Sequence, residues 1–197
     1  MAEISLSVYQ NRLDDALAKG NFNEVIAHCR HILITYPKNI KAYSQMGQAL
    51  YSVSRWDEAA ELFRRMLGAL PNDYVAHRHL GQIYQRLERY DDAIWHTERA
   101  YDQQPNNPDV INYLRTLYRN HRGKDIQRLQ LTAGAVAQQH IRNGLYQQAV
   151  TVLNKALSRY PARIDLKVLR IRALWQAEKY LDAAEGAIDV LEVLPYS

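Results

Sequence analysis

Histidine and cysteine are the side chains of this sequence whose spacing first suggests chemistry. His28 and His31 stand three residues apart, so one helix would place both imidazoles on the same face, within reach of one metal ion. No second pair or acidic ligand set accompanies them, and His77 and His79, two residues apart, would point to different sides of a helix. We therefore expect no metal site and no cofactor, and we expect Cys29, the single cysteine, to be a small buried packing residue.

Motifs of the common enzyme classes are missing from the sequence. It contains no glycine-rich phosphate loop, no dinucleotide fingerprint, no nucleophile elbow and no HExxH metal pair. Trp56, Trp95 and Trp175 fall at helical positions, which favours packing over a platform for stacking bases. We expect no catalytic residues and conclude that the protein is not an enzyme.

The formal net charge of +4 raises the question of a nucleic-acid partner. Basic residues alternate with acidic ones, as in 55–58 and 88–92, and the densest basic stretch, 115–128, lies across an irregular segment. An electrostatic footprint for nucleic acid requires basic side chains that cluster on one face. Nucleic acid is therefore not the expected partner.

The sequence also lacks the patterns of a membrane or secreted protein. No apolar run approaches the roughly 20 residues that a membrane helix needs. Residues 1–13 are mixed polar, without the basic and apolar blocks of a signal peptide. Because one cysteine suits a reducing compartment, we expect a cytoplasmic protein with no membrane partner.

The spacing of the prolines predicts the elements that position these side chains. Pro37, Pro71 and Pro105 are 34 residues apart, and so are Pro161 and Pro195. Each unit of this period holds two segments with apolar residues at i, i+3, i+4 and i+7, which predicts a pair of helices. No segment alternates like a strand, so the fold class is all-α. The repeating frames cover 6–39, 40–73, 74–107, 130–163 and 164–197, and leave 108–129 over.

Residue types recur at fixed positions inside these frames. Glycine and alanine would let the two helices approach closely, the proline would end the second helix, and Asn39, Asp73 and Asn107 would cap the helix that follows. The second frame has Tyr43, Met46, Gly47, Leu50, Trp56, Ala59, Phe63 and Pro71. The third has His77, Leu80, Gly81, Tyr84, Tyr90, Ala93, Ala100 and Pro105.

This pattern resembles the tetratricopeptide repeat (TPR) family, in which a large residue, leucine-glycine and tyrosine precede a small alanine, an aromatic residue and a closing proline. The resemblance covers nearly the whole chain and departs from the pattern at Leu13, Ala137 and Ile171, which replace the glycine. It implies a right-handed solenoid of helical hairpins with about eleven helices.

Residues 108–129 interrupt the period. Apolar spacing predicts one helix over 109–121, a turn at 120–123 and a longer helix over 125–143. The long helix would replace the second helix of one unit and the first of the next, or the turn region would form a short remnant of a helix.

Two interpretations of this interruption stay open. In one, an odd number of helices produces a kink or a change of curvature near 119–129. The array then divides into 1–121, with three full repeats and one helix, and 122–197, with the long helix and two repeats. In the other, the extra residues are a variation in repeat length that does not affect the groove.

The resemblance implies a binding groove on the first helix of each hairpin. There this chain has an amide-rich, net basic strip, whose arginines can hold carboxylates and whose amides can hold peptide backbone. We expect an extended or acidic peptide segment of another protein as the partner; a solvated face without a ligand is the alternative. TPR proteins that bind chaperones have a carboxylate clamp of lysine and asparagine. This chain has Ser44 and Gln48 at those positions and so does not reproduce the clamp. The predicted groove residues are Lys41, Gln45, Gln48, Tyr51, Arg78, His79, Gln82, Arg86, Asn112, Tyr113 and Arg119.

The last predicted helix, 180–194, has a wide apolar stripe, and no capping helix follows it. Either the chain is part of a longer protein, or this helix takes part in self-association. The sequence thus predicts first a protein–protein interaction scaffold or adaptor. The alternatives are a regulatory or targeting region of a longer enzyme and a self-assembling structural subunit.

Overall fold

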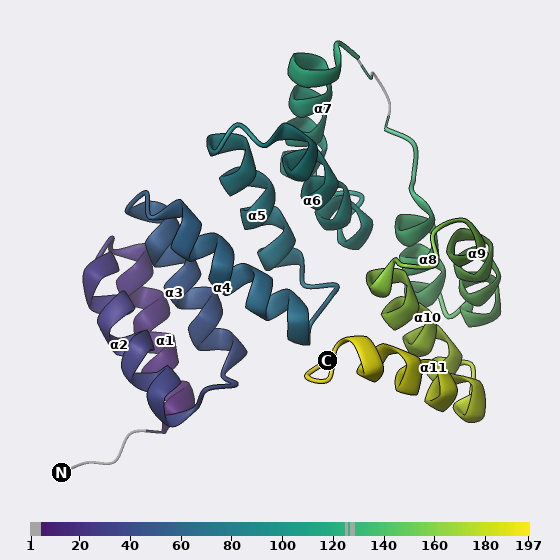
Figure 1. Ribbon diagram of the computed structural model, residues 1–197, viewed down its shortest axis with the longest axis horizontal. Helices are drawn as coiled ribbons and strands as arrows, with labels where there is room; N and C mark the ends of the chain where they lie inside the picture. The colour runs from purple at the N-terminus through teal and green to yellow at the C-terminus, as the bar shows by residue number, and fades with distance from the viewer. Residues whose placement is uncertain (1–4, 125, 127–128) are drawn as a thin grey trace. The chain divides into compact units, whose positions relative to one another are not determined.

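Two compact units of packed helices make up the chain (Figure 1). The computed structural model describes residues 5–124, 126 and 129–197. The units are Met1–Met66 and Leu67–Ser197, and each is described by itself. Within the described residues there are eleven α-helices and no strand, which confirms the predicted all-α class. None of the helices described is long and apolar enough to cross a bilayer.

Helical hairpins form the first unit. α2 packs against α3, and α1 packs against both. A Cβ on Gly47 of α3 would lie 2.8 Å from the ring of Phe63 in α4, so the glycine permits the close approach of these two helices. The helices are α1 (Leu6–Ala18), α2 (Phe22–Thr35), α3 (Ile40–Ser52) and α4 (Trp56–Ala69), whose last residues belong to the second unit.

Cys29 lies in the core of the first unit. Its side chain is fully buried, which confirms the predicted packing role. Burial raises the pKa of the thiol to about 12, and the negative charge of Asp14 adds to the rise. The thiolate that would act as a nucleophile or metal ligand is therefore disfavoured.

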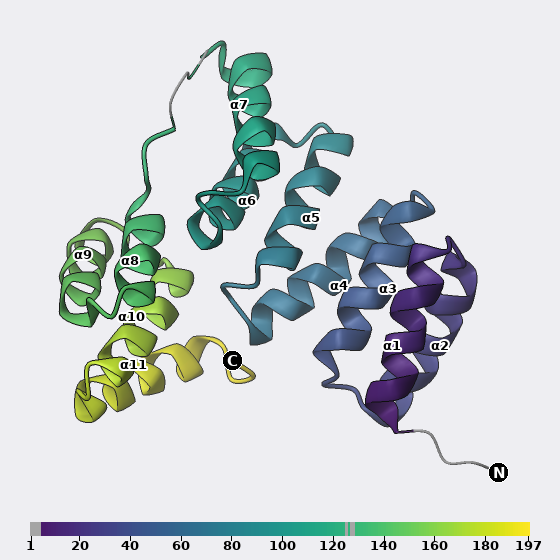
Figure 2. The ribbon, with the colours of Figure 1, turned by 180° about the vertical axis from the view of Figure 1, so that it is seen from behind.

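Besides the last residues of α4, the described part of the second unit contains seven helices. Each helix packs against a neighbour in the chain, and in addition α6 packs against α8 and α8 against α10 (Figures 1 and 2). The C-terminal helices share an apolar core that includes Leu153, Leu166 and Leu169. The helices are α5 (Tyr74–Arg86), α6 (Tyr90–Gln103), α7 (Pro108–Arg122), α8 (Ala133–Arg142), α9 (Tyr146–Arg159), α10 (Ile164–Gln176) and α11 (Tyr180–Val193).

Side-chain caps begin several of these helices. Asn39, Asp73 and Asn107 each accept a hydrogen bond from a backbone N–H in the first turn of the helix that follows, as predicted. Pro108 occupies the first turn of α7, and Gly123 ends that helix with a left-handed φ of 59°. The three predicted caps are confirmed, whereas α7 continues to Arg122 and so includes most of the predicted turn at 120–123.

The predicted long helix over 125–143 is wrong in its first part, because α8 begins only at Ala133. Residues 125 and 127–128 lie outside the described residues. The Thr132 hydroxyl accepts a hydrogen bond from the Ala135 N–H at 3.1 Å and donates one to the carboxylate of Asp102 in α6. This cap starts the helix at a tertiary contact that apolar spacing cannot reveal.

Helices on both sides of the segment 123–132 pack together inside the second unit. α8 contacts α6, and Arg163, which precedes α10, lies 3.4 Å from Asp102 of α6. The predicted division of the repeats into 1–121 and 122–197, and the predicted change of curvature, stay predictions.

Candidate functional site

A pocket of about 370 Å³ opens between α5, α6 and α7 in the second unit. It brings together two predicted residues of α5, Arg78 and Gln82, with two of α7, Asn112 and Tyr113. Arg78 and Asn112 are exposed, whereas Gln82 and Tyr113 are half-buried. The remaining lining residues are Thr97, Ala100, Asp109 and Val110.

The floor of this pocket depends on the close approach of α5 and α6. A Cβ on Gly81 would lie 2.5 Å from the Thr97 hydroxyl oxygen. That hydroxyl donates a hydrogen bond to the Ala93 carbonyl at 2.7 Å and is buried. Thr97 therefore shapes the floor, and its hydrogen-bond donor is already used inside the protein.

Tyr113 forms one wall and fixes α7 to α5. Its hydroxyl donates to Gln85 Oε1 at 2.7 Å and lies 3.2 Å from the Gly81 carbonyl oxygen. Because the hydroxyl is engaged, the ring offers a ligand mainly its apolar face. Tyr113 thus contributes position and contact area more than a free polar group.

The lining of the pocket is close to neutral. Arg78 supplies a positive charge and Asp109 a negative one, so the net basic character predicted for the groove does not come from this pocket. His79 is buried and lies outside the lining, which corrects its predicted place on the groove surface. Burial, with a smaller effect of the Arg78 charge, lowers the pKa of His79 to about 4, so its imidazole is neutral at pH 7.

A second hollow of about 580 Å³ continues along α5 and α7. It includes one predicted groove residue, Arg86. Gln85, which accepts the hydrogen bond from Tyr113, links the two hollows. Arg119 is exposed on α7 but lines neither. The other lining residues are Gln85, Glu88, Tyr90, Leu117, Asn120 and His121.

A family model described as tetratricopeptide repeat matches residues 44–108 and 137–193, more than half of the chain. The chain belongs to the TPR family. Its resemblance to that family and its class, a solenoid of TPR-type helical hairpins, are therefore confirmed.

Solved structures named MamA share the fold of this TPR protein. One, titled as the crystal structure of MamA, is 16% identical with a TM-score of 0.53, and the match covers 97% of this chain and 95% of that one. A MamA structure labelled AMB-1 is 16% identical with a TM-score of 0.51, and the match covers 93% of this chain and 88% of that one. At this identity the likeness shows the fold alone. No curated protein sequence matches the chain.

Four predicted groove residues of the TPR array lie in the first unit. Gln45 is buried. Its amide donates a hydrogen bond to the Gln10 carbonyl at 2.7 Å and another to Asp14 Oδ1 at 2.6 Å. It joins α3 to α1 and does not face a groove, which corrects its predicted place. The exposed Lys41 also pairs with Asp14, at 3.0 Å. Gln48 donates to the Ser44 hydroxyl at 3.1 Å, and Tyr51 is half-buried.

A buried ionic cluster that the sequence analysis did not predict joins α6, one of the TPR helices around the pocket, to the start of α10. Arg99 Nε lies 3.0 Å from Asp102 Oδ2, and Arg163 Nη2 lies 2.5 Å from Asp165 Oδ2 and 3.4 Å from Asp102. Burial raises the pKa of Asp102, while the charge of Arg99 opposes the rise. The signal within the sequence is the i, i+3 spacing of Arg99 and Asp102; the pairing with residues 163–165 needs the tertiary fold.

Two of the three tryptophans of the TPR hairpins are not the packing residues predicted. Trp95 is 44% exposed and Trp175 is 59% exposed, whereas Trp56 is half-buried. The ring of Trp95 lies 5.2 Å from the guanidinium carbon of Arg99, which makes it a partial cover over the ionic cluster. Helical spacing cannot separate such a cover from a core residue, because both lie toward neighbouring helices.

Proposed function

We propose that this TPR protein is a non-enzymatic scaffold that binds an extended segment of a partner protein along α5 and α7. The observation that carries the proposal is the pocket in which Arg78 and Gln82 meet Asn112 and Tyr113. We also propose a cytoplasmic location, since the single cysteine, Cys29, has no second cysteine with which to form an internal disulfide.

The chemistry of the pocket favours a particular kind of segment. The amides of Gln82 and Asn112 can donate to and accept from a peptide backbone, and the Tyr113 ring gives apolar contact. The guanidinium of Arg78 can hold one carboxylate in a two-pronged hydrogen bond. Because Asp109 would repel a second carboxylate nearby, an extended segment with one acidic side chain fits better than a run of acids.

The test begins with a random peptide library displayed against the whole chain, and enriched peptides are then measured by fluorescence anisotropy. Arg78→Glu should weaken their binding at least about tenfold, because a charge-assisted hydrogen bond contributes about 1.5–3 kcal/mol. Asn112→Ala should weaken it less. Arg159→Glu, a reversal at another exposed arginine, is the matched control. Equal binding by wild type and Arg78→Glu would place the site elsewhere.

A further inference from the structure

The outward side of α11 carries an apolar row next to an acidic row. Leu181, Ile188 and Leu191 are 82%, 60% and 45% exposed. On a helix with 3.6 residues per turn, the four carboxylates of α11 fall beside this row on one flank only. The opposite side, with Ala183, Gly186 and Val190, is buried. The acidic row consists of Asp182, Glu185, Asp189 and Glu192, all exposed.

Within α11 itself, Asp182 lies in the first turn, where the helix dipole favours a carboxylate, and the other three members of the acidic row do not. α11 contains no basic residue, and among the described residues none of the ion pairs involves these four carboxylates. Asp189 and Glu192 lie near the C-terminal end, where the partial negative charge of the helix disfavours carboxylates. This accumulation stands out in a chain with a net charge of +4, and it favours a positively charged partner.

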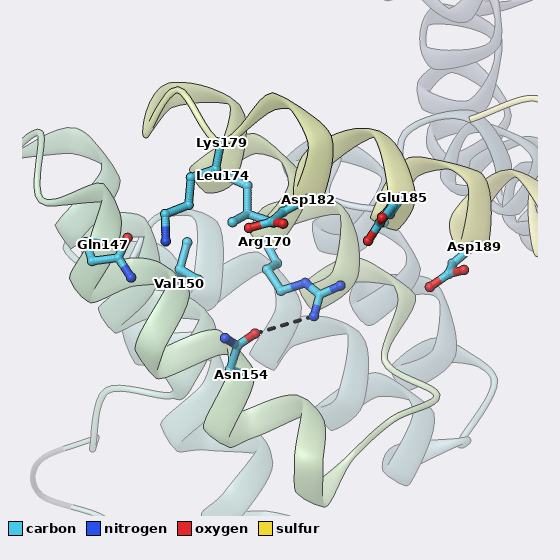
Figure 3. A pocket seen from close by; sticks show the side chains of 10 residues that line it. Gln147, Val150, Asn154, Arg170, Leu174, Lys179, Asp182, Glu185 and Asp189 are labelled. Carbon is cyan, nitrogen blue, oxygen red and sulfur yellow. Dashed lines mark hydrogen bonds between the residues drawn. The ribbon is translucent and has the colours of Figure 1, made fainter.

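A groove of about 330 Å³ lies between this acidic row and α9. Figure 3 shows Asp182, Glu185 and Asp189 in a row along α11, with Arg170 beneath them. The guanidinium of Arg170 donates to Asn154 Oδ1 at 3.4 Å. Lys179 and Arg170 also line the groove, and the guanidinium of Arg170 extends toward Glu185 in Figure 3. Asp189 is the carboxylate of this groove that Figure 3 shows farthest from both basic side chains.

We propose that the outer side of α11 docks an amphipathic helix of a partner protein. Apolar residues of that helix at i, i+3 or i+4, and i+7 would cover Leu181, Ile188 and Leu191. Lysine or arginine on one flank would reach Glu185 and Asp189. Because the carboxylates lie on one side of the apolar row only, the arrangement selects a helix whose basic residues lie on the matching flank.

The charges disfavour a second copy of α11 packed antiparallel to the first as the occupant. In a two-fold antiparallel pair, both acidic rows would lie on the same side of the contact, where like charges repel. The self-association predicted through 180–194 would therefore have to overcome this repulsion. A basic amphipathic helix would turn the same charges into attraction.

Designed helical peptides test the proposal on the whole chain by fluorescence anisotropy. The first has leucines along one stripe and lysines on one flank, and the second has glutamates in place of those lysines. The lysine peptide should bind at least about tenfold more tightly than the glutamate peptide, and its affinity should fall as salt is added. A preference of this size supports the proposal that the acidic row recognises basic residues of the partner helix. Equal binding of both peptides would overturn that proposal.

Variants then locate the contact. Ile188→Ser and the triple change Asp182→Asn, Glu185→Gln and Asp189→Asn alter exposed side chains, so both should keep the helical circular dichroism of the wild type. Each of these changes should lower the affinity for the lysine peptide at least about fivefold. Asp57→Asn, a change at an exposed acid of α4, is the control.

Two further outcomes would overturn the proposal. Undiminished binding of the lysine peptide to Ile188→Ser and to the triple variant would remove α11 as the site. A wild-type dimer in sedimentation equilibrium that becomes monomeric in Ile188→Ser would identify a second copy as the occupant. Neither result bears on the pocket of α5 and α7, because the two surfaces share no residue.

Discussion

Asp102 accepts a hydrogen bond from Thr132 and faces the guanidinium groups of Arg99 and Arg163. Its side chain is only 3% exposed, and that of Arg99 only 6%. Removal of this carboxylate would take away the nearest partner of Arg99 and leave the two guanidinium groups to share Asp165, with Glu98 3.4 Å from Arg99. We predict that Asp102→Ala lowers the free energy of unfolding by about 3–5 kcal/mol, measured by urea denaturation.

An exposed ion pair provides the control for this prediction. Arg122 lies 3.3 Å from Asp91, whose side chain is 86% exposed. Exposed pairs of this kind contribute about 0–1 kcal/mol, so Asp91→Ala should change stability by no more than that. Similar losses in both variants would show that burial does not govern the Asp102 effect.

Two buried histidines make the stability of the protein depend on pH. The pKa values of His77 and His79 are both lowered to about 4, mainly by burial. An unfolded histidine titrates near 6.5, so between about pH 6.5 and 4 the unfolded chain binds more protons than the native one. The free energy of unfolding should therefore fall as the pH falls through this range.

Urea denaturation at pH 7 and pH 5 measures this dependence. His79→Gln should reduce the difference in stability between the two pH values, because it removes one of the two buried groups. His31→Gln, at an exposed position, should leave the difference unchanged. A pH dependence that is identical in all three proteins would contradict the assignment.

Gly81 sets the distance between α5 and α6. A Cβ at this position would lie 2.5 Å from the Thr97 hydroxyl oxygen and 3.3 Å from the Ala93 carbonyl. We predict that Gly81→Ala lowers the free energy of unfolding by about 1–3 kcal/mol through overpacking, measured by thermal or urea denaturation. Thr97→Ala in the same chain should recover part of the loss, since it removes the nearest atom.

A helical glycine with free space provides the comparison. A Cβ on Gly68 of α4 would meet nothing within 4 Å. Gly68→Ala should therefore raise the free energy of unfolding, by about 0.5–1 kcal/mol, through the better helix propensity of alanine. Equal effects at both glycines would show that packing against Thr97 is not the cause.

The elements of the fold could largely be predicted from the sequence, because prolines and caps act locally. Pro71 and Asp73, for example, mark the end of α4 and the start of α5 without any tertiary information. The start of α8 could not be predicted, since Thr132 depends on Asp102, 30 residues earlier. Apolar spacing across this segment continues the helical period and conceals the break.

The candidate site was predictable to a smaller extent. Repeat positions placed Arg78, Gln82, Asn112 and Tyr113 on first helices, and the structure brings these four to one pocket. Gln45 occupies an equivalent position, yet it packs against α1. A repeat position gives the direction of a side chain relative to its own hairpin. The neighbouring hairpin determines whether that side chain is exposed to solvent or covered.

For the molecule as a whole, the repeat architecture predicts that a substitution destabilises mainly the helices close to it. In such arrays each repeat contacts mainly its neighbours, so stability is close to a sum of local contributions. In Asp102→Ala, backbone amides of α6, α8 and α10 should exchange with deuterium faster, whereas those of α1 and α2 should keep wild-type rates. Hydrogen exchange followed by mass spectrometry measures both groups, and uniformly faster exchange would show one cooperative unit.

The pairing of Asp102 with Arg163 also has a consequence for synthesis on the ribosome. Most contacts of this chain join residues close in sequence, but this pair is 61 residues apart. At about 5–20 residues per second, Arg163 is made roughly 3–12 s after Asp102. During that interval the inner side of α6 has neither Arg163 nor Asp165 to cover it. The nascent chain therefore passes through a stage in which the carboxylate of Asp102, buried in the folded protein, is still open to water and to chaperones.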